Sequence, residues 1–115
     1  MPRGDVIYVD LPMPAGGAGH EQSGNRPAVI LQSNNSPTNN PMMMIVPMTS
    51  KLTALRFPHT IEVTPSQQNG LRYPSVLLVF QLRAISKGRI QNTVGHLEDQ
   101  YMRQLESEIK SLLAV

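Results

Sequence analysis

Residues 6–11 read VIYVDL, residues 12–25 read PMPAGGAGHEQSGN and residues 27–32 read PAVILQ. The first and third segments are rich in β-branched and other apolar side chains, which favour β-strands. The segment between them is rich in glycine, proline and small polar residues, so it is typical of a long, mobile loop. These residues therefore predict two strands joined by a loop that has no regular structure.

Further short strands follow along the chain after a polar connection at residues 33–41. Pro47 is expected to force an edge position or a bulge, because proline donates no hydrogen bond to a neighbouring strand. Asn69-Gly70 indicates a turn. The predicted strands are residues 42–49 (MMMIVPMT), residues 59–64 (HTIEVT) and residues 75–85 (SVLLVFQLRAI), the last being one long strand or a bent pair.

One substantial helix is predicted over residues 99–113. Glu98 and Asp99 lie at its start, where acidic groups meet the positive end of the helix dipole. Apolar side chains recur on a single stripe at steps of three and four residues: Tyr101, Met102, Leu105, Ile109, Leu112 and Leu113. Several short strands followed by a terminal helix predict a single domain over residues 1–115, a small β-barrel closed by the helix.

The composition excludes several kinds of site. The 115-residue chain has no cysteine, which excludes disulfides, thiolate zinc sites and cysteine nucleophiles. Its three histidines form no metal-binding motif, so we expect no metal and no cofactor. No apolar run approaches the ~20 residues that span a bilayer, and the opening residues do not resemble a signal peptide. We therefore expect a cytoplasmic protein.

The net charge of +2 is unevenly distributed. Residues 1–97 carry eight basic and four acidic side chains, whereas residues 98–115 carry two basic and four acidic ones. The body of the chain is thus mildly basic and its last segment acidic. A basic body suits a polyanionic ligand, although many ordinary domains carry a similar charge.

Five short motifs occur in order along the chain: RGDVIYVDL (residues 3–11), GHEQSGNRPAV (19–29), PMTS (47–50), QLRAI (81–85) and GHL (95–97). Together they resemble the motifs of the MazF/PemK (Kid) toxins of bacterial toxin–antitoxin modules. The block at residues 19–29 follows the family signature G-H-E-Q-x-G-x-R-P-A-V almost letter for letter. The similarity runs from about Arg3 to Leu113 with matching gaps.

The resemblance implies an SH3-like β-barrel, a homodimer and a sequence-specific, metal-independent endoribonuclease that cuts single-stranded RNA. Without a metal, the adjacent 2′-hydroxyl attacks the phosphate and leaves a 2′,3′-cyclic phosphate and a 5′-hydroxyl. The protein must hold that geometry, neutralise charge on the phosphate and move two protons. The resemblance also implies a partner, an antitoxin whose acidic segment covers the RNA groove.

Three residues are the candidates for catalysis. Arg26 carries a forked, permanently charged donor that matches phosphate oxygens, although an arginine at a strand end is often only solvated. Thr49 has a hydroxyl that could bind phosphate or orient the 2′-hydroxyl, or could serve only the local turn. His20 titrates near neutrality and could protonate the leaving oxygen, or lie unused in its loop.

Other residues are candidates for contact with the RNA. They are Glu21, Gln22, Ser50, Lys51, Arg56, Gln81 and Arg83. The chain also departs from the family, because Leu78 and Phe80 stand where related toxins carry an arginine and a carboxylate. Phe80 could stack on a base or simply pack in the core of a strand.

Two alternative functions remain open. A toxin of the same fold could act by binding a protein, as the CcdB toxins do when they poison DNA gyrase. A degenerate member could bind RNA or antitoxin without cutting, which the loss of charge at Leu78 and Phe80 would favour. An intact RNA pool would support either alternative, and inhibition of gyrase would distinguish them.

Overall fold

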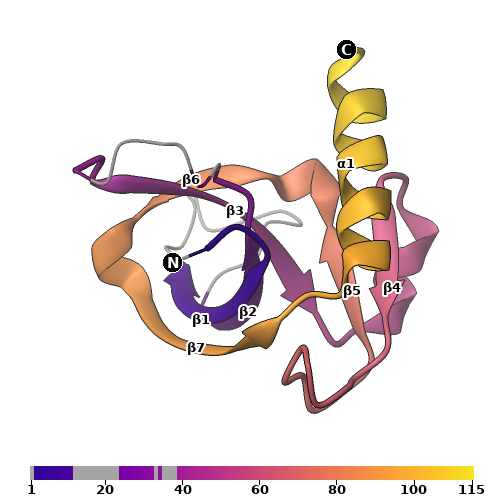
Figure 1. Cartoon of the computed structure of the whole chain (residues 1–115). Coiled ribbons are helices and arrows are strands. Elements are labelled where there is room, and N and C mark those ends of the chain that lie inside the picture. The colour runs from indigo at the N-terminus through magenta and orange to yellow at the C-terminus, as the bar shows by residue number, and fades with distance from the viewer. Residues whose placement is uncertain (1, 12–23, 33, 35–38) are drawn as a thin grey trace.

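The computed structural model describes residues 2–11, 24–32, 34 and 39–115 of the chain. Within these residues the structure is mainly β and ends in one long helix, α1 (Asp99–Leu113) (Figure 1). The strands are β1 (Asp5–Leu11), β2 (Gly24–Ile30), β3 (Met42–Thr49), β4 (Thr60–Val63), β5 (Ser75–Leu78), β6 (Arg83–Ser86) and β7 (Ile90–His96). Short 3-10 helices are η1 (Leu52–Arg56), η2 (Val79–Gln81) and η3 (Lys87–Arg89).

The strands form one antiparallel sheet in the order β4-β5-β3-β2-β1-β7, and β6 pairs with the first half of β3. Figure 1 shows that the sheet curls strongly, and α1 packs against the edge strand β4. The predicted mainly β fold with a C-terminal helix is confirmed. The predicted closure is corrected, because in the described residues β4 and β7 do not pair and the barrel-like sheet stays open. A helix that covers an edge strand leaves no need for closure.

β3 lies at the centre of the sheet and changes partner at Pro47. Its residues up to Ile45 pair with β6, whereas its residues from Met48 onward pair with β5. On the other side, Pro47 stands opposite Ala28 of β2. Proline has no N–H for a second neighbouring strand, so the change of partner falls where that donor is missing. The predicted edge position is therefore wrong, and Pro47 marks a change of partner rather than the predicted bulge.

Both faces of the central strands are buried, in two separate clusters. One cluster includes Val6, Val29 and Leu105 of α1. The other includes Ile7 and Ile30. Successive side chains of a strand point to opposite faces of the sheet, so neighbours in the sequence belong to different clusters. Burial on both faces explains why residues 6–9 read as an almost continuous apolar run.

The helix α1 has the predicted bounds, and most of its predicted apolar stripe is buried. Leu105 is fully buried at the centre of the contact with the sheet. Four further members are partly buried against the same cluster: Tyr101, Met102, Ile109 and Leu112. Leu113 is 55% exposed, so its place in the stripe is wrong. Figure 1 shows the reason, because the last turn of α1 projects beyond the strands.

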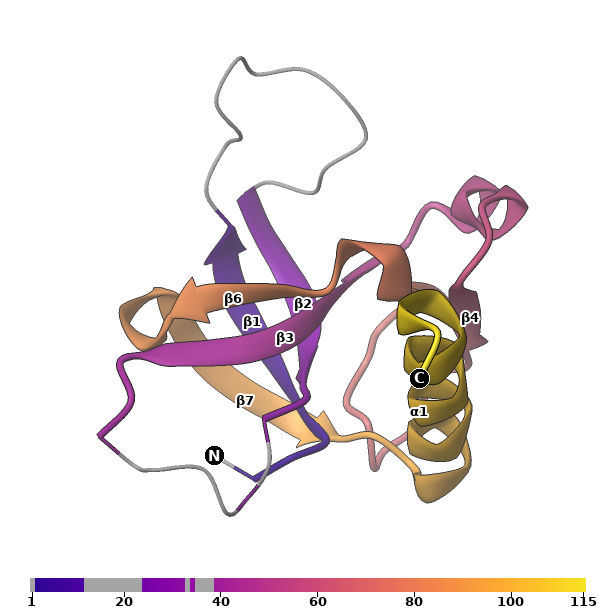
Figure 2. The same cartoon turned by 90° about the horizontal axis from the view of Figure 1, so that it is seen from above.

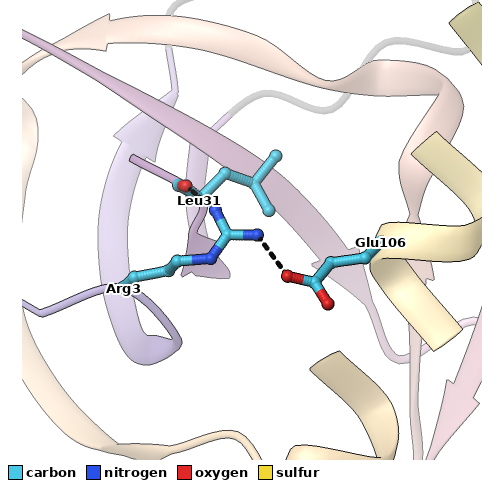
Figure 3. Close-up of polar contacts among 3 residues, drawn as sticks. All are labelled: Arg3, Leu31 and Glu106. Carbon is cyan, nitrogen blue, oxygen red and sulfur yellow. Dashed lines mark hydrogen bonds and ion pairs between the residues drawn. The ribbon is translucent and has the colours of Figure 1, made fainter. Parts of the chain in front are cut away.

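Two polar contacts tie α1 to the rest of the fold. Nη2 of Arg3 lies 2.9 Å from Oε2 of Glu106, while its Nη1 donates to the carbonyl of Leu31 (Figure 3). Nδ1 of His59 lies 2.9 Å from Oε2 of Glu108. The acidic C-terminal segment is thus partly paired with groups of the basic body.

Some element boundaries differ from those predicted. β2 begins at Gly24, within the predicted loop, because Gly24 pairs with Leu11 at the end of β1. The bent pair predicted at residues 75–85 is confirmed, with η2 forming the bend between β5 and β6. The turn at Asn69-Gly70 is also confirmed, with a φ of 71° at Gly70.

β7 was not expected from the sequence. Most side chains of this strand are exposed or partly exposed, so they show no apolar alternation. β7 forms the edge of the sheet beside β1. No helix in the described residues is long and apolar enough to cross a membrane.

Candidate active site

Arg26 lies near the beginning of β2. Its backbone stands opposite Val9 of β1, which is fully buried, whereas the Arg26 side chain is exposed. The buried side chains of Val29 and Ile30 anchor the same strand in the two core clusters. The arginine therefore stands on a fixed backbone with its guanidinium at the surface, which is the placement that an anion-binding group needs.

Thr49 is the last residue of β3 and is only 6% exposed. Its backbone pairs with Val76 of β5, which fixes its position. Its Oγ1 accepts a hydrogen bond from the backbone N–H of Lys51 at 3.2 Å. The turn interpretation of this hydroxyl is thus confirmed. A hydroxyl has one donor and two acceptor positions, so this bond leaves its hydrogen available to a substrate.

The strand register brings Arg26 and Thr49 to the same end of the sheet. β2 and β3 are antiparallel, and Ala28 and Pro47 are their last paired residues toward the start of β2 and the end of β3. Arg26 lies two residues before Ala28 and Thr49 lies two residues after Pro47, so alternation along each strand directs both side chains to the face of this last pair. Figure 2 shows the tip of β1 and the start of β2 side by side at the top of the view.

The connection from β3 to β4 carries three further predicted residues. Ser50 and Lys51 follow Thr49 directly and are exposed. Arg56 ends η1, and its guanidinium carbon lies 5.0 Å from the centre of the Phe57 ring. These residues extend the candidate site from the end of β3 over η1.

Gln81 and Arg83 do not lie beside the Thr49 end of β3. Gln81 ends η2, and Arg83 stands opposite Ile45 in the β3–β6 pair. Thr49 lies four residues beyond Ile45, which is about 13 Å of extended strand. Arg83 is therefore set apart from Thr49 along the sheet.

The remaining predicted residues are His20, Glu21 and Gln22. They lie outside the residues that the structure describes. The chain enters the described region again at Gly24, two residues before Arg26.

Leu78 and Phe80 are the two positions at which the sequence is expected to depart from the family. Leu78 is buried at the end of β5. Phe80 lies in η2 and packs against Phe57, with ring centres 5.7 Å apart and ring planes tilted by 54°. The suggestion that Phe80 packs inside an apolar strand is wrong, because the chain leaves the strand before it reaches this residue.

A polar cluster at the opposite end of β1 was not predicted. Glu98 accepts hydrogen bonds from Oγ of Ser66 at 2.7 Å and from Nδ2 of Asn69 at 3.1 Å. Partial burial by itself would raise the pKa of the Glu98 carboxyl, but the bonds from Ser66, from its own backbone and from Asn69 lower that pKa below its ordinary value. The sequence signals for this cluster were the turn at Asn69-Gly70 and the acidic residue Glu98 at the start of the helix, but nothing in the sequence indicated that they meet.

The end of the sheet near Arg26 and Thr49 offers a cation and a hydroxyl on neighbouring strands. A guanidinium stays charged at all relevant pH values and pairs with two oxygens of a phosphate. A hydroxyl can add one directed hydrogen bond. Among the described residues, no three histidine, aspartate or glutamate side chains are grouped so that they could hold a metal ion.

Comparison with known sequences finds one matching family, described as PemK-like, MazF-like toxin of type II toxin–antitoxin system, over residues 2–113. The chain is 29% identical over 113 residues to Endoribonuclease EndoA of Bacillus subtilis, covering 98% of this chain and 94% of the relative. It is 31% identical over 109 residues to Endoribonuclease MazF of Staphylococcus saprophyticus, covering 95% of this chain and 88% of that relative.

Solved structures share the fold. MazF from Deinococcus radiodurans superimposes with a TM-score of 0.81 at 21% identity, covering 100% of this chain and 97% of that one. An endoribonuclease from Mycobacterial species, solved in complex with its cognate antitoxin, superimposes with a TM-score of 0.74 at 16% identity, covering 100% and 94%. At these identities the likeness establishes the fold alone.

Proposed function

The chain belongs to the PemK-like, MazF-like toxin family of type II toxin–antitoxin systems, and from this premise we propose that it is an endoribonuclease toxin. The observation that carries the proposal is the strand register that brings Arg26 and Thr49 to one end of the sheet and directs both side chains to the same face. The curated relatives that match nearly the whole chain are named endoribonucleases, which supports the same activity.

The proposed reaction cleaves single-stranded RNA by attack of a 2′-hydroxyl on the adjacent phosphorus. A bond forms between O2′ and phosphorus while the bond from phosphorus to O5′ breaks. The proton of the 2′-hydroxyl passes to a base, and a proton is delivered to the departing O5′. The products are a 2′,3′-cyclic phosphate and a 5′-hydroxyl, and no metal takes part.

Arg26 and Thr49 supply binding and charge stabilisation in this scheme. Arg26 binds the non-bridging phosphate oxygens and becomes more effective as negative charge builds on them. Thr49 donates its hydroxyl hydrogen to the phosphate or to the 2′-oxygen while its oxygen stays bound to the N–H of Lys51. His20 is assigned the proton for O5′ by its chemistry and its place in the family motif.

The substrate and partners follow from the family and from charge. We assign messenger RNA in the cytoplasm as the substrate, with Ser50, Lys51 and Arg56 contacting its backbone. An acidic antitoxin segment competes for the same cations, as expected when carboxylates replace phosphates. A homodimer completes the proposed assembly. Glu21, Gln22, Gln81 and Arg83 are assigned secondary contacts to the bases.

A second candidate function is binding without cleavage. The observation that favours it is the pair of apolar side chains at Leu78 and Phe80, which leaves no carboxylate at these positions to accept the proton. In this case the chain would hold RNA through Arg26 and Lys51 and leave it intact.

A cleavage assay with matched arginine variants tests the proposed function. The wild-type chain, Arg26→Ala and Arg103→Ala are each incubated with a long messenger RNA. Arg103 is exposed on α1, so its replacement removes the same charge outside the candidate site. We expect the wild type and Arg103→Ala to cut and Arg26→Ala to fail. RNA that stays intact but still binds the wild type would establish the second function instead.

A further inference from the structure

The two phenylalanines of the chain meet outside both core clusters. Phe57 follows η1 and Phe80 lies in η2, with ring centres 5.7 Å apart and a tilt of 54° between the ring planes. Both side chains are partly exposed, and neither belongs to either of the buried clusters. An aromatic pair of this kind, placed between two loops, is not required to fill the core.

A cation completes this group. The guanidinium carbon of Arg56 lies 5.0 Å from the centre of the Phe57 ring, within the range of a cation–π contact. Arg56 is exposed, so its planar group is open to solvent. We call Arg56, Phe57 and Phe80 the aromatic cluster.

The aromatic cluster is held in place by backbone contacts. Oγ1 of Thr60 donates to the carbonyl of Phe57 at 2.9 Å. The N–H of Val79 donates to the carbonyl of His59 at 3.0 Å, which joins η2 to the start of β4. The rings are therefore presented by a fixed frame, which lowers the entropy cost of binding a flat ligand.

The cluster adjoins the end of β3 that carries Thr49. η1 begins directly after Lys51, so Phe57 belongs to the segment that leaves this strand end. η2 joins β5 to β6, the two strands that pair with successive parts of β3, and it contacts β3. The two loops thus meet next to the proposed site of phosphate binding.

We propose that the aromatic cluster stacks against one nucleobase of the RNA and holds the nucleotide that neighbours the cleaved phosphate. This inference rests on the proposed endoribonuclease function. A partly exposed aromatic pair beside a guanidinium offers the two kinds of surface on which unpaired bases stack. Such stacking contributes to affinity and favours the larger rings of purines, because stacking strength sets the base preference. Phe80 is thus a specificity-determining residue.

Phe80→Leu tests the proposal, because leucine keeps an apolar side chain and removes the ring. We expect KM for a short RNA substrate to rise about 5- to 150-fold, which corresponds to the ~1–3 kcal/mol of base stacking. kcat and the midpoint of thermal unfolding should hardly change, and the preference for a purine at one position of the cleaved sequence should weaken. Phe80→Tyr, which keeps the ring, should restore KM.

Two further variants control the experiment. Tyr73→Leu removes a ring that is 66% exposed outside the cluster and should leave KM unchanged. Arg56→Lys keeps the charge and removes the planar guanidinium, and we expect it to raise KM even if Phe80→Leu fails to fold. A folded Phe80→Leu with an unchanged KM would overturn the proposal; if that variant does not fold, an unchanged KM in Arg56→Lys would overturn it.

The outcome is distinguishable from failure of the proposed function. If the wild type cuts RNA but the cluster variants match it in KM and in base preference, only the stacking proposal fails. If the wild type does not cut, binding of a fluorescent single-stranded RNA decides, because the cluster variants should still bind it more weakly than the wild type. Equal binding would then overturn the stacking proposal as well.

Discussion

Arg26 and Thr49 reach the same sheet end in different surroundings. Arg26 is exposed, whereas Thr49 is only 6% exposed and its hydroxyl already accepts one hydrogen bond. Loss of the arginine should therefore change the chemistry without changing the fold. Loss of the threonine hydroxyl should change both.

Arg26→Ala should lower kcat/KM for RNA by about 10²- to 10³-fold, the usual effect of removing one group that stabilises charge in a transition state. The midpoint of thermal unfolding should stay close to that of the wild type, because the side chain is exposed. Steady-state kinetics and a thermal melt check both statements. Retention of full activity in this variant would exclude Arg26 from the mechanism.

Thr49→Val should lower both activity and stability. Without the hydroxyl the N–H of Lys51 loses its acceptor, which should cost about 1 kcal/mol of the free energy of unfolding. The lost bond to a charged phosphate should reduce kcat about 10- to 100-fold. Thr49→Ser keeps the hydroxyl and serves as the control. Equal activity of the two variants would leave Thr49 with its turn role alone.

At the scale of elements, some strands and the helix could be predicted from the sequence with their bounds. β3 and α1 each bury apolar side chains, so their sequences show the apolar patterns from which a strand and a helix can be recognised. β7 could not be predicted, because an edge strand with mostly exposed side chains needs no such pattern. The position of Pro47 was informative, but the change of partner at this residue depends on where β5 and β6 lie, which a local pattern does not contain.

The cluster of Glu98, Ser66 and Asn69 joins the start of α1 to the turn before β5, and it predicts a dependence of stability on pH. The pKa of Glu98 is lowered in the folded protein, so the charged carboxylate stabilises the fold above its ordinary pKa of 4.5. This contribution should be lost as the pH falls through the lowered pKa. Unfolding curves from about pH 7 to about pH 3 should show a shallower acid dependence for Glu98→Gln than for the wild type. Parallel curves would argue against this role for Glu98.

The packing of α1 can be tested with two leucines of the same helix. Leu105→Ala should lower the free energy of unfolding by about 2–5 kcal/mol, because it leaves a cavity in the core. Leu113→Ala should change it by less than about 0.5 kcal/mol, since Leu113 is largely exposed. Denaturant unfolding measures both values, and the single domain proposed here should unfold in one transition. If both changes lowered the free energy of unfolding equally, Leu105 would not be a core residue of the contact between α1 and the sheet.

At the scale of the whole molecule, the uneven charge has a structural counterpart. Glu106 and Glu108 of the acidic helix pair with Arg3 and His59 of the body. These contacts help to explain how an acidic segment packs against a basic one. Lys51 and Arg56 are exposed on the connection that follows Thr49, where the proposed RNA backbone would contact them.

The residues of the candidate site stay predictions from the sequence, and the fold accounts for the position of two of them. The motifs identified Arg26 and Thr49, and the register of β2 and β3 accounts for their common position. The contact between Phe57 and Phe80 joins two segments far apart in the chain, so only the folded structure could reveal it. His20 stays a prediction, because it lies outside the described residues.

The central claim is a metal-independent cut in RNA that leaves a 5′-hydroxyl. The most direct measurement incubates the purified chain with a long single-stranded RNA in excess EDTA and maps the 5′-hydroxyl ends by sequencing. We predict discrete ends within one short sequence, each paired with an upstream fragment that ends in a 2′,3′-cyclic phosphate. Intact RNA, 5′-phosphate ends or cleavage that disappears in EDTA would contradict the account.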